Sequence, residues 1–357
     1  MVAFIKEAYL SSFKEKSIPS LDGLRAISIL LVILGHSSFI FDKTLPFLAN
    51  YFSILQGYGV SIFFGLSGFL ICSILLKDKN NIGKVNLKLF YIKRLFRIFP
   101  PYYFYLLCVY IISSFYEWGP TKVELVAAIL YLWNYVYQTK FWLLGHSWSL
   151  SVEEQFYIFW PLMVSILSWN NLKKTIIGLI LFSPLIRLGM YYLFPEWRGR
   201  ISIMLHTRID SLMYGCLLAF YYDSITEKLS EIVAKYKLIP ILLTFCLAIS
   251  PLLRYLFKGA YGLPIGYSVE GLSFVLLIFV SMKLNSNNII FKFLNNRWMR
   301  HIGILSYGLY LWQQLFLYHE INFSFTILRY LGLYFTVLVI YICIEYPIMK
   351  FSVKYRH

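Results

Sequence analysis

Two side chains that could do chemistry, Arg25 and His36, lie in the first long apolar segment, 21–36. Eleven steps of about 100° return almost to the same direction around an α-helix, so both would lie on one face, about 16 Å apart along its axis. A histidine titrates near neutral pH, which suits it to remove a proton from a hydroxyl group. An ionisable side chain at membrane depth is costly, so the pair is a functional-site hypothesis. The alternative is a structural histidine hydrogen-bonded to a neighbouring helix.

A second pair, Arg94 and Arg97, precedes two prolines in the stretch RLFRIFPPYY at 94–103. Residues three apart share a helix face, so both guanidinium groups would point the same way. Their forked shape suits recognition of phosphate from the cytoplasm, at the inner entrance of a spanning helix. The alternative is a pair of topological anchors that touch lipid headgroups.

Two adjacent carboxylates, Glu153 and Glu154, enter an apolar segment in the stretch HSWSLSVEEQFY at 146–157. Ser151 and Glu154 fit the S-x-x-E pattern of a helix capping box, which would make Glu154 structural. That interpretation does not cover Glu153. Adjacent helical residues diverge by about 100°, so at most one of the two is expected to point squarely into a central cavity.

Further candidates are Arg208 and Asp210, which stand two residues apart before another apolar segment. We interpret them as a pair that braces the wall of the protein rather than as catalysts. Close helix packing is the expected role of the glycines in the second apolar segment: Gly57, Gly59, Gly65 and Gly68.

The composition is that of a polytopic membrane protein. Of the 357 residues, 59% are hydrophobic and only 14% are charged, whereas a soluble domain carries about a quarter charged residues. The net charge is +16, but the basic residues lie between apolar segments, which is typical of inner loops and does not indicate nucleic-acid binding. We predict an all-α fold of about ten spanning helices around a polar cavity: 22–42, 57–76, 98–116, 150–168, 175–194, 209–222, 238–257, 265–282, 302–319 and 327–345.

The distribution of basic residues predicts the orientation. With both termini cytoplasmic, 23 of the 33 lysines and arginines fall on the inner side and eight on the outer side. This asymmetry requires that the short apolar stretch 123–137 does not span. The segment 119–149 is then an outer re-entrant or interfacial piece.

We expect a single integral-membrane domain over residues 1–357, without a cleavable signal peptide. The five cysteines are scattered singly through apolar stretches and show no spacing typical of a metal site, so no metal is expected.

These motifs resemble those of the acyltransferase-3 family, integral-membrane O-acyltransferases that modify bacterial surface glycans. The matching stretches keep the family's order over nearly the whole chain: LDGLRAISILLVILGH (21–36), GVSIFFGLSGFLI (59–71), RLFRIFPPYY (94–103), HSWSLSVEEQFYIFWP (146–161), RIDSLMYGCLLA (208–219) and SYGLYLWQ (306–313). One departure is Gln313, where members often carry a histidine; we include it among the residues expected to line the cavity.

The resemblance implies an acyl-CoA donor, often acetyl-CoA, taken from the cytoplasm as a co-substrate, with no permanently bound cofactor. The acceptor would be a hydroxyl of a cell-surface or lipid-linked glycan, and the protein would lie in the inner membrane of a bacterium. It also implies that Arg25 and His36 are essential and that Arg94 and Arg97 are functional. Some members carry an added extracytoplasmic esterase-like domain, which we do not expect here.

The resulting hypothesis makes His36 the base that removes the acceptor's proton, near Glu153, with coenzyme A phosphates held by Arg94 and Arg97. Transfer could be direct or pass through an acyl-enzyme. Arg25 would position His36 indirectly or bind the donor, because about 16 Å is too far for direct contact. One alternative is a transporter or flippase of a lipid-linked sugar; another is the same chemistry with a succinyl or longer acyl group.

Overall fold

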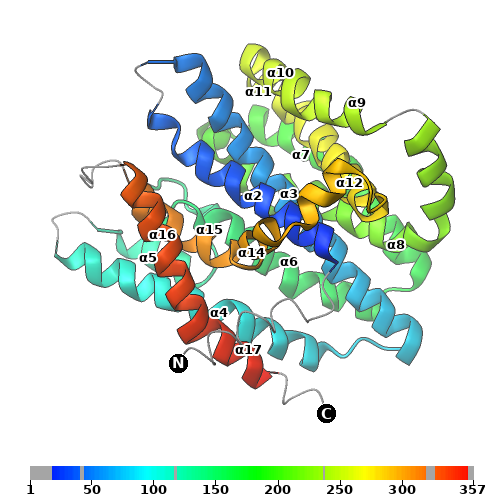
Figure 1. The fold of residues 1–357 in the computed structure, drawn as a ribbon, viewed down its shortest axis with the longest axis horizontal. Helices are drawn as coiled ribbons and strands as arrows, with labels where there is room; N and C mark the ends of the chain where they lie inside the picture. The colour runs from blue at the N-terminus through cyan, green and yellow to red at the C-terminus, as the bar shows by residue number, and fades with distance from the viewer. Residues whose placement is uncertain (1–17, 41–43, 116–118, 236–237, 319–325, 353–357) are drawn as a thin grey trace.

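The computed structural model describes residues 18–40, 44–115, 119–235, 238–318 and 326–352, and within them the chain is helical, without a β-strand (Figure 1). The longer helices are α2 (Pro19–His36), α3 (Pro46–Ile82), α4 (Leu87–Ser114), α6 (Ser147–Ile166), α7 (Trp169–Leu193), α8 (Leu205–Lys235), α12 (Tyr267–Lys283), α15 (Ser306–Leu317) and α16 (Thr326–Ile340). The shorter ones are α5 (Lys122–Ile129), α9 (Leu238–Thr244), α10 (Ser250–Phe257), α11 (Gly259–Tyr261), α13 (Ile289–Asn295), α14 (Arg297–Ile304) and α17 (Tyr346–Ser352). Short π-helical turns join α9 to α10, α11 to α12 and α16 to α17.

Several helix starts follow local chemistry and differ from those of the predicted segments. α2 and α3 each begin at a proline, whose missing N–H costs nothing in the first turn. α4 begins after Asn86, whose side chain accepts a hydrogen bond from the backbone N–H of Leu89, and it continues through Pro100 and Pro101. α4 therefore starts eleven residues earlier than predicted. Arg94 and Arg97 lie within this helix, well past its first turn, rather than at its entrance.

The central helix is α3, which packs against α2, α6, α8 and α12 (Figure 1). Close approach depends on glycine: a Cβ added at Gly68 would lie 2.0 Å from the carbonyl oxygen of Leu212, and one at Gly215 would lie 2.2 Å from that of Gly65. The predicted packing role is confirmed for Gly59, Gly65 and Gly68. It is wrong for Gly57, which has open space around it.

We expect Gly215→Ala to lower the melting temperature of the purified protein by several degrees. The added Cβ meets main-chain atoms of α3, which cannot swing aside, and overpacking of this kind costs about 1–3 kcal/mol or more. Thermal unfolding in detergent measures the change. Gly189→Ala on α7 is the matched control, because its Cβ would meet nothing within 4 Å. Equal melting temperatures for the two variants would contradict this contact between α3 and α8.

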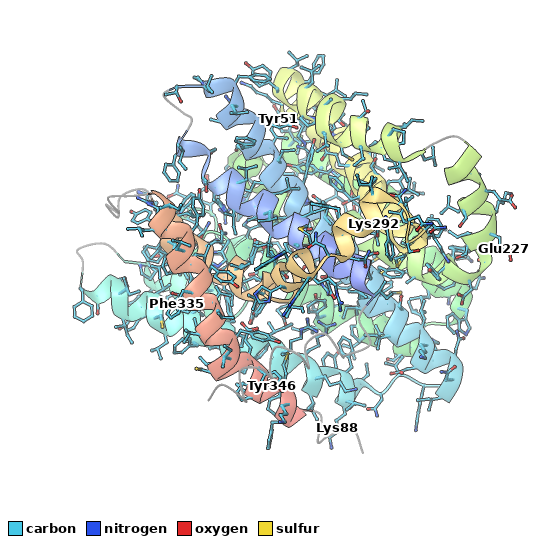
Figure 2. The ribbon with its side chains drawn as sticks, viewed as in Figure 1. Tyr51, Lys88, Glu227, Lys292, Phe335 and Tyr346 are labelled. Atoms are coloured by element: carbon cyan, nitrogen blue, oxygen red, sulfur yellow. The ribbon has the colours of Figure 1, made fainter. Side chains whose placement is uncertain are left out.

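Among the described residues, six helical stretches are long and apolar enough to cross a membrane: α3, α4, α7, the α9–α10 run, the α11–α12 run and the α16–α17 run. The outside of the molecule carries many large apolar side chains, such as Phe335 on α16, as a lipid-facing surface would (Figure 2). Tyr51, near the start of α3, and Lys88, near the start of α4, lie at opposite ends of the bundle in that view. The protein is thus a multi-pass membrane protein; ten spans and the side of each terminus stay predictions.

The carboxylate of Glu124 holds the start of α5 and the backbone at Lys140 and Phe141 together. Thr121 and Glu124 form a capping box at the start of α5, and the other oxygen of Glu124 accepts from the backbone N–H of Lys140 and Phe141, at 2.8 and 3.1 Å. Burial favours the neutral acid, but these hydrogen bonds outweigh it and lower the pKa of Glu124 below its ordinary value. At about 1.5 Å per residue, the eight residues of α5 are too short to span the membrane, in agreement with the prediction.

Candidate active site

His36, the last residue of α2, lies between two glutamine side chains. Its Nδ1 is 2.6 Å from Oε1 of Gln313 on α15, and its Nε2 is 2.6 Å from the amide nitrogen of Gln56 on α3. Because Gln313 accepts and Gln56 donates, the proton lies on Nδ1 and the lone pair on Nε2. The rings of Trp142 and His36 are nearly perpendicular, with centroids 5.5 Å apart. The arrangement holds a neutral imidazole in one tautomer, as a general base requires.

Gly35 explains how Gln56 reaches this imidazole. A Cβ at residue 35 would lie 2.3 Å from the Cβ of Gln56, so a larger side chain there would push α3 away from the end of α2. The predicted site residue Gln313 is fully buried, and its amide nitrogen has no hydrogen-bond partner among the described residues. A buried N–H₂ group without a partner is costly. Beside a candidate base, this group could donate to a developing negative charge.

A second histidine–glutamine pair, which the sequence analysis did not single out, lies next to the first. The side chain of Gln314 accepts from the backbone N–H of His146 at 3.1 Å and from its Nδ1 at 2.7 Å. The Nε2 of His146 is buried and has no partner in the described part of the chain. Tyr105 and Tyr310 meet the ring edge to face, with centroids 5.3 and 5.6 Å away. The signal in the sequence was two consecutive glutamines in an otherwise apolar helix; only the structure shows that each contacts a histidine.

Arg25 and Glu153 belong to a different cluster from His36. Arg25 forms an ion pair with Asp22, at 2.7 Å. Glu153 on α6 accepts from the hydroxyls of Ser67 and Tyr157, both at 3.0 Å, and the charges of Arg94 and Arg25 act on it.

The two predicted donor-binding residues complete this cluster. The guanidinium of Arg94 lies over the ring of Tyr157, 4.8 Å from its centroid, and both Arg94 and Arg97 are close enough to repel Arg25 electrostatically. Neither Arg94 nor Arg97 forms an ion pair with a described residue. Arg94 is half-buried and Arg97 is exposed. The cluster therefore offers guanidinium groups that form no direct ion pair with a described residue, although the charges of Glu153 and Glu154 act on Arg94 and that of Glu345 acts on Arg97.

Glu154 is not the capping residue that its sequence suggested. α6 begins at Ser147, four residues earlier than the expected cap, and the Ser151 hydroxyl donates to the carbonyl of Ser147 inside the helix. Glu154 is buried, and its charge acts on Arg94 and on tyrosines of α4 and α15, among them Tyr102 and Tyr307. The two carboxylates therefore face different surroundings.

The candidate residues lie in two groups at different positions along α3, which we call levels. Gln56, which contacts His36, and Ser67, which contacts Glu153, are eleven residues apart on the same face of α3. At 1.5 Å per residue this places them about 16 Å apart along the helix. The expectation that Glu153 lies near His36 is not met: Gln313 joins the level of His36, while Glu153 joins that of Arg25, Arg94 and Arg97.

The expected pair of Arg208 and Asp210 is wrong. Asp210 forms an ion pair with Arg187 of α7, at 2.8 Å, with both side chains fully buried. Arg208 instead donates to the hydroxyl of Ser61 on α3, at 2.7 Å. Residues two apart on a helix point in different directions, so the two cannot meet on α8. In the described part of the chain, no group of three His, Cys, Asp or Glu side chains could hold a metal ion.

Comparison with known proteins connects this arrangement to a family. The family model described as "Acyltransferase domain" matches residues 18–347. A protein named "Putative O-acetyltransferase" from Staphylococcus aureus strain COL is 29% identical over 96% of this chain and 57% of its own length. O-acetyltransferase OatA from Staphylococcus aureus strain NCTC 8325 is 28% identical over 84% of this chain and 50% of its own length. The chain thus spans about half the length of these relatives, and no solved structure matches it. Since the family model covers nearly all of its residues, the chain belongs to the acyltransferase-3 family.

Proposed function

We propose that this protein is a membrane O-acyltransferase that moves an acyl group, most simply acetyl, from cytoplasmic acyl-CoA to a hydroxyl of a cell-surface or lipid-linked glycan. The observation that carries the proposal is that one helical bundle holds both a candidate base and two arginines, at the two levels described above. One level holds the neutral imidazole of His36 between Gln56 and Gln313, and the other holds Arg94 and Arg97 without an ion-pair partner among the described residues.

The separation of about 16 Å between the levels suits coenzyme A. Its phosphates and its thioester lie at opposite ends of a long pantetheine arm. Arg94 and Arg97 would hold the phosphates through charge-assisted hydrogen bonds, while the arm carries the thioester toward His36. Arg25 adds positive charge at the phosphate level, and its ion pair with Asp22 fixes its direction.

Acyl transfer then needs a base and a donor to the oxyanion. The acceptor hydroxyl first replaces the Gln56 amide at Nε2 of His36; as its oxygen attacks the thioester carbonyl, Nε2 takes the hydroxyl proton, and Gln313 keeps the other ring nitrogen protonated. The amide nitrogen of Gln313 would donate to the negative oxygen of the tetrahedral intermediate. The carbon–sulfur bond breaks, the proton passes to the leaving thiolate, and an ester and free coenzyme A remain.

The relatives support an O-acetyltransferase because their printed names state that activity. A test uses the purified protein in detergent with acetyl-CoA, and follows the free thiol of coenzyme A with and without added surface glycan. We expect thiol release that depends on the protein and rises with the acceptor. A flippase would neither release thiol nor be stabilised by acetyl-CoA against thermal unfolding.

We propose that the protein lies in the inner membrane of a bacterium. The connection between α3 and α4 then faces the cytoplasm, and residues 119–149 lie on the outer side. Single cysteines at Lys84 and Lys140, in a background without native cysteines, report the side through a membrane-impermeant reagent. Cysteine at 140 should react in intact cells, and cysteine at 84 only after permeabilisation. The reverse pattern would overturn the orientation and, with it, a cytoplasmic acyl-CoA site at Arg94 and Arg97.

A further inference from the structure

Three arginines from three helices lie around one aromatic ring, that of Tyr267. The guanidinium carbons of Arg187, Arg208 and Arg254 lie 5.6, 4.3 and 4.0 Å from the ring centroid of Tyr267. Tyr267 is the first residue of α12, and the arginines come from α7, α8 and α10; α8 packs against α12, while α7 and α10 pack against the π-helical turn Gly262–Gly266 that precedes it. None of these residues takes part in the proposed acyl transfer.

Two of the arginines are neutralised by carboxylates. Arg187 forms its ion pair with Asp210, at 2.8 Å, and it also donates to the hydroxyl of Ser268 and to two backbone carbonyls. Arg254 donates through Nε to Glu270 at 2.7 Å, and its terminal nitrogen bonds the second oxygen of the same carboxylate. Each of these cations therefore has one anion of its own.

Arg208 has no such anion. It is only 3% exposed, and its single hydrogen bond to the described residues goes to the hydroxyl of Ser61. Its Nε is buried and unpartnered in the described part of the chain. Asp210, the nearest carboxylate in sequence, forms its ion pair with Arg187; its charge also acts on Arg208, but no hydrogen bond joins the two. The cluster thus contains three cations and two carboxylates.

An unpaired guanidinium at this depth is costly. Removing a charge from water is unfavourable unless an opposite charge compensates, and contact with an aromatic ring offsets only part of that cost. A guanidinium carries its N–H donors in a planar fork, the geometry that binds two oxygens of one oxyanion. The free Nε–H of Arg208 is one of the donors that such an anion would use.

We propose that Arg208 binds an oxyanion, a phosphate or a carboxylate, between α3, α8 and α12. The ligand would balance the third positive charge and satisfy the free Nε. Arg208 is the fourth residue of α8, so in the predicted topology the site lies in the outer half of the bundle. The phosphate of a lipid headgroup and a charged group on an acceptor share this chemistry. The site does not depend on the proposed acyl transfer.

The test is thermal unfolding of the full chain, purified in an uncharged maltoside detergent. Sodium phosphate and sodium acetate are titrated at constant ionic strength, with chloride as the balancing anion. A second arm adds short-chain phosphatidylglycerol in place of the soluble anions. We expect wild type to gain several degrees in melting temperature in at least one arm, because a ligand that binds only the folded state stabilises it.

Arg208→Gln removes the cation but keeps a polar side chain, and Arg208→Lys keeps the charge without the fork. We expect the Gln variant to fold and to lose the oxyanion-dependent shift, and the Lys variant to retain part of it. The matched control Arg198→Gln removes an exposed arginine and should keep the whole shift. If only one arm stabilises the protein, that arm identifies the ligand as a soluble oxyanion or as a lipid headgroup. The proposal is overturned if wild type responds in neither arm, or if Arg208→Gln responds as wild type does.

Discussion

Replacing His36 by glutamine is expected to lower acyl transfer by about 10²–10⁴-fold, the usual contribution of a general base. Glutamine can still hydrogen-bond to Gln56 and Gln313, but it cannot take a proton at neutral pH. The melting temperature and the binding of acyl-CoA should therefore stay close to those of wild type. The measurement is the initial rate of acyl transfer at equal amounts of folded protein.

His206→Gln is the matched control for this variant. His206 lies at the start of α8, where its ring stacks on Tyr135 and its Nδ1 contacts the Tyr135 hydroxyl at 3.1 Å, away from the two glutamines. The His206→Gln variant should transfer acyl groups at nearly the wild-type rate. A His36→Gln variant within a few-fold of wild type would end the assignment of His36 as the base and leave it a structural residue.

The second large effect is expected on the donor. Arg94→Ala and Arg97→Ala should each raise the apparent KM for acyl-CoA by roughly tenfold to a hundredfold, since a hydrogen bond to a charged group is worth about 1.5–3 kcal/mol. The KM for the acceptor should change little, because these arginines lie at the other level of the site. Steady-state kinetics with each substrate varied in turn give the two constants.

Lys93→Ala separates donor binding from membrane orientation. Lys93 is an exposed cation on α4, adjacent to Arg94 and on a different side of the helix. If the arginines act only as topological anchors, all three variants should lower protein abundance alike and leave the KM for acyl-CoA unchanged. A selective rise for the two arginine variants supports phosphate binding.

Much of the fold could be predicted because membrane-spanning helices leave a strong local signal. The apolar segment 238–257 coincides with the run from α9 to α10, and the exclusion of 123–137 as a span agrees with the short helix α5. Helix ends were less predictable. α3 and α8 continue well into polar sequence, because tertiary packing and capping, rather than hydropathy, decide where a helix stops.

The side-chain partners depended on information that the local sequence does not hold. Gln313 meets His36 across 277 residues, and Asp210 finds Arg187 on a neighbouring helix rather than the arginine beside it. The capping-box interpretation of Glu154 was wrong because α6 starts at Ser147, before the expected cap. The position of Glu153 relative to His36 depends on how α6 packs along α3. The spacing of residues within one segment does not determine that packing.

The comparison that tests the proposed function most directly is the acyl content of surface glycans from cells with and without this gene. Mass spectrometry and NMR would quantify ester-linked acyl groups on the isolated glycans, with genes for wild type and His36→Gln returned at equal membrane abundance. We expect the ester to disappear on deletion, to return with wild type, and to stay absent with His36→Gln. Unchanged ester content on deletion, or full restoration by His36→Gln, would contradict acyl transfer by this site.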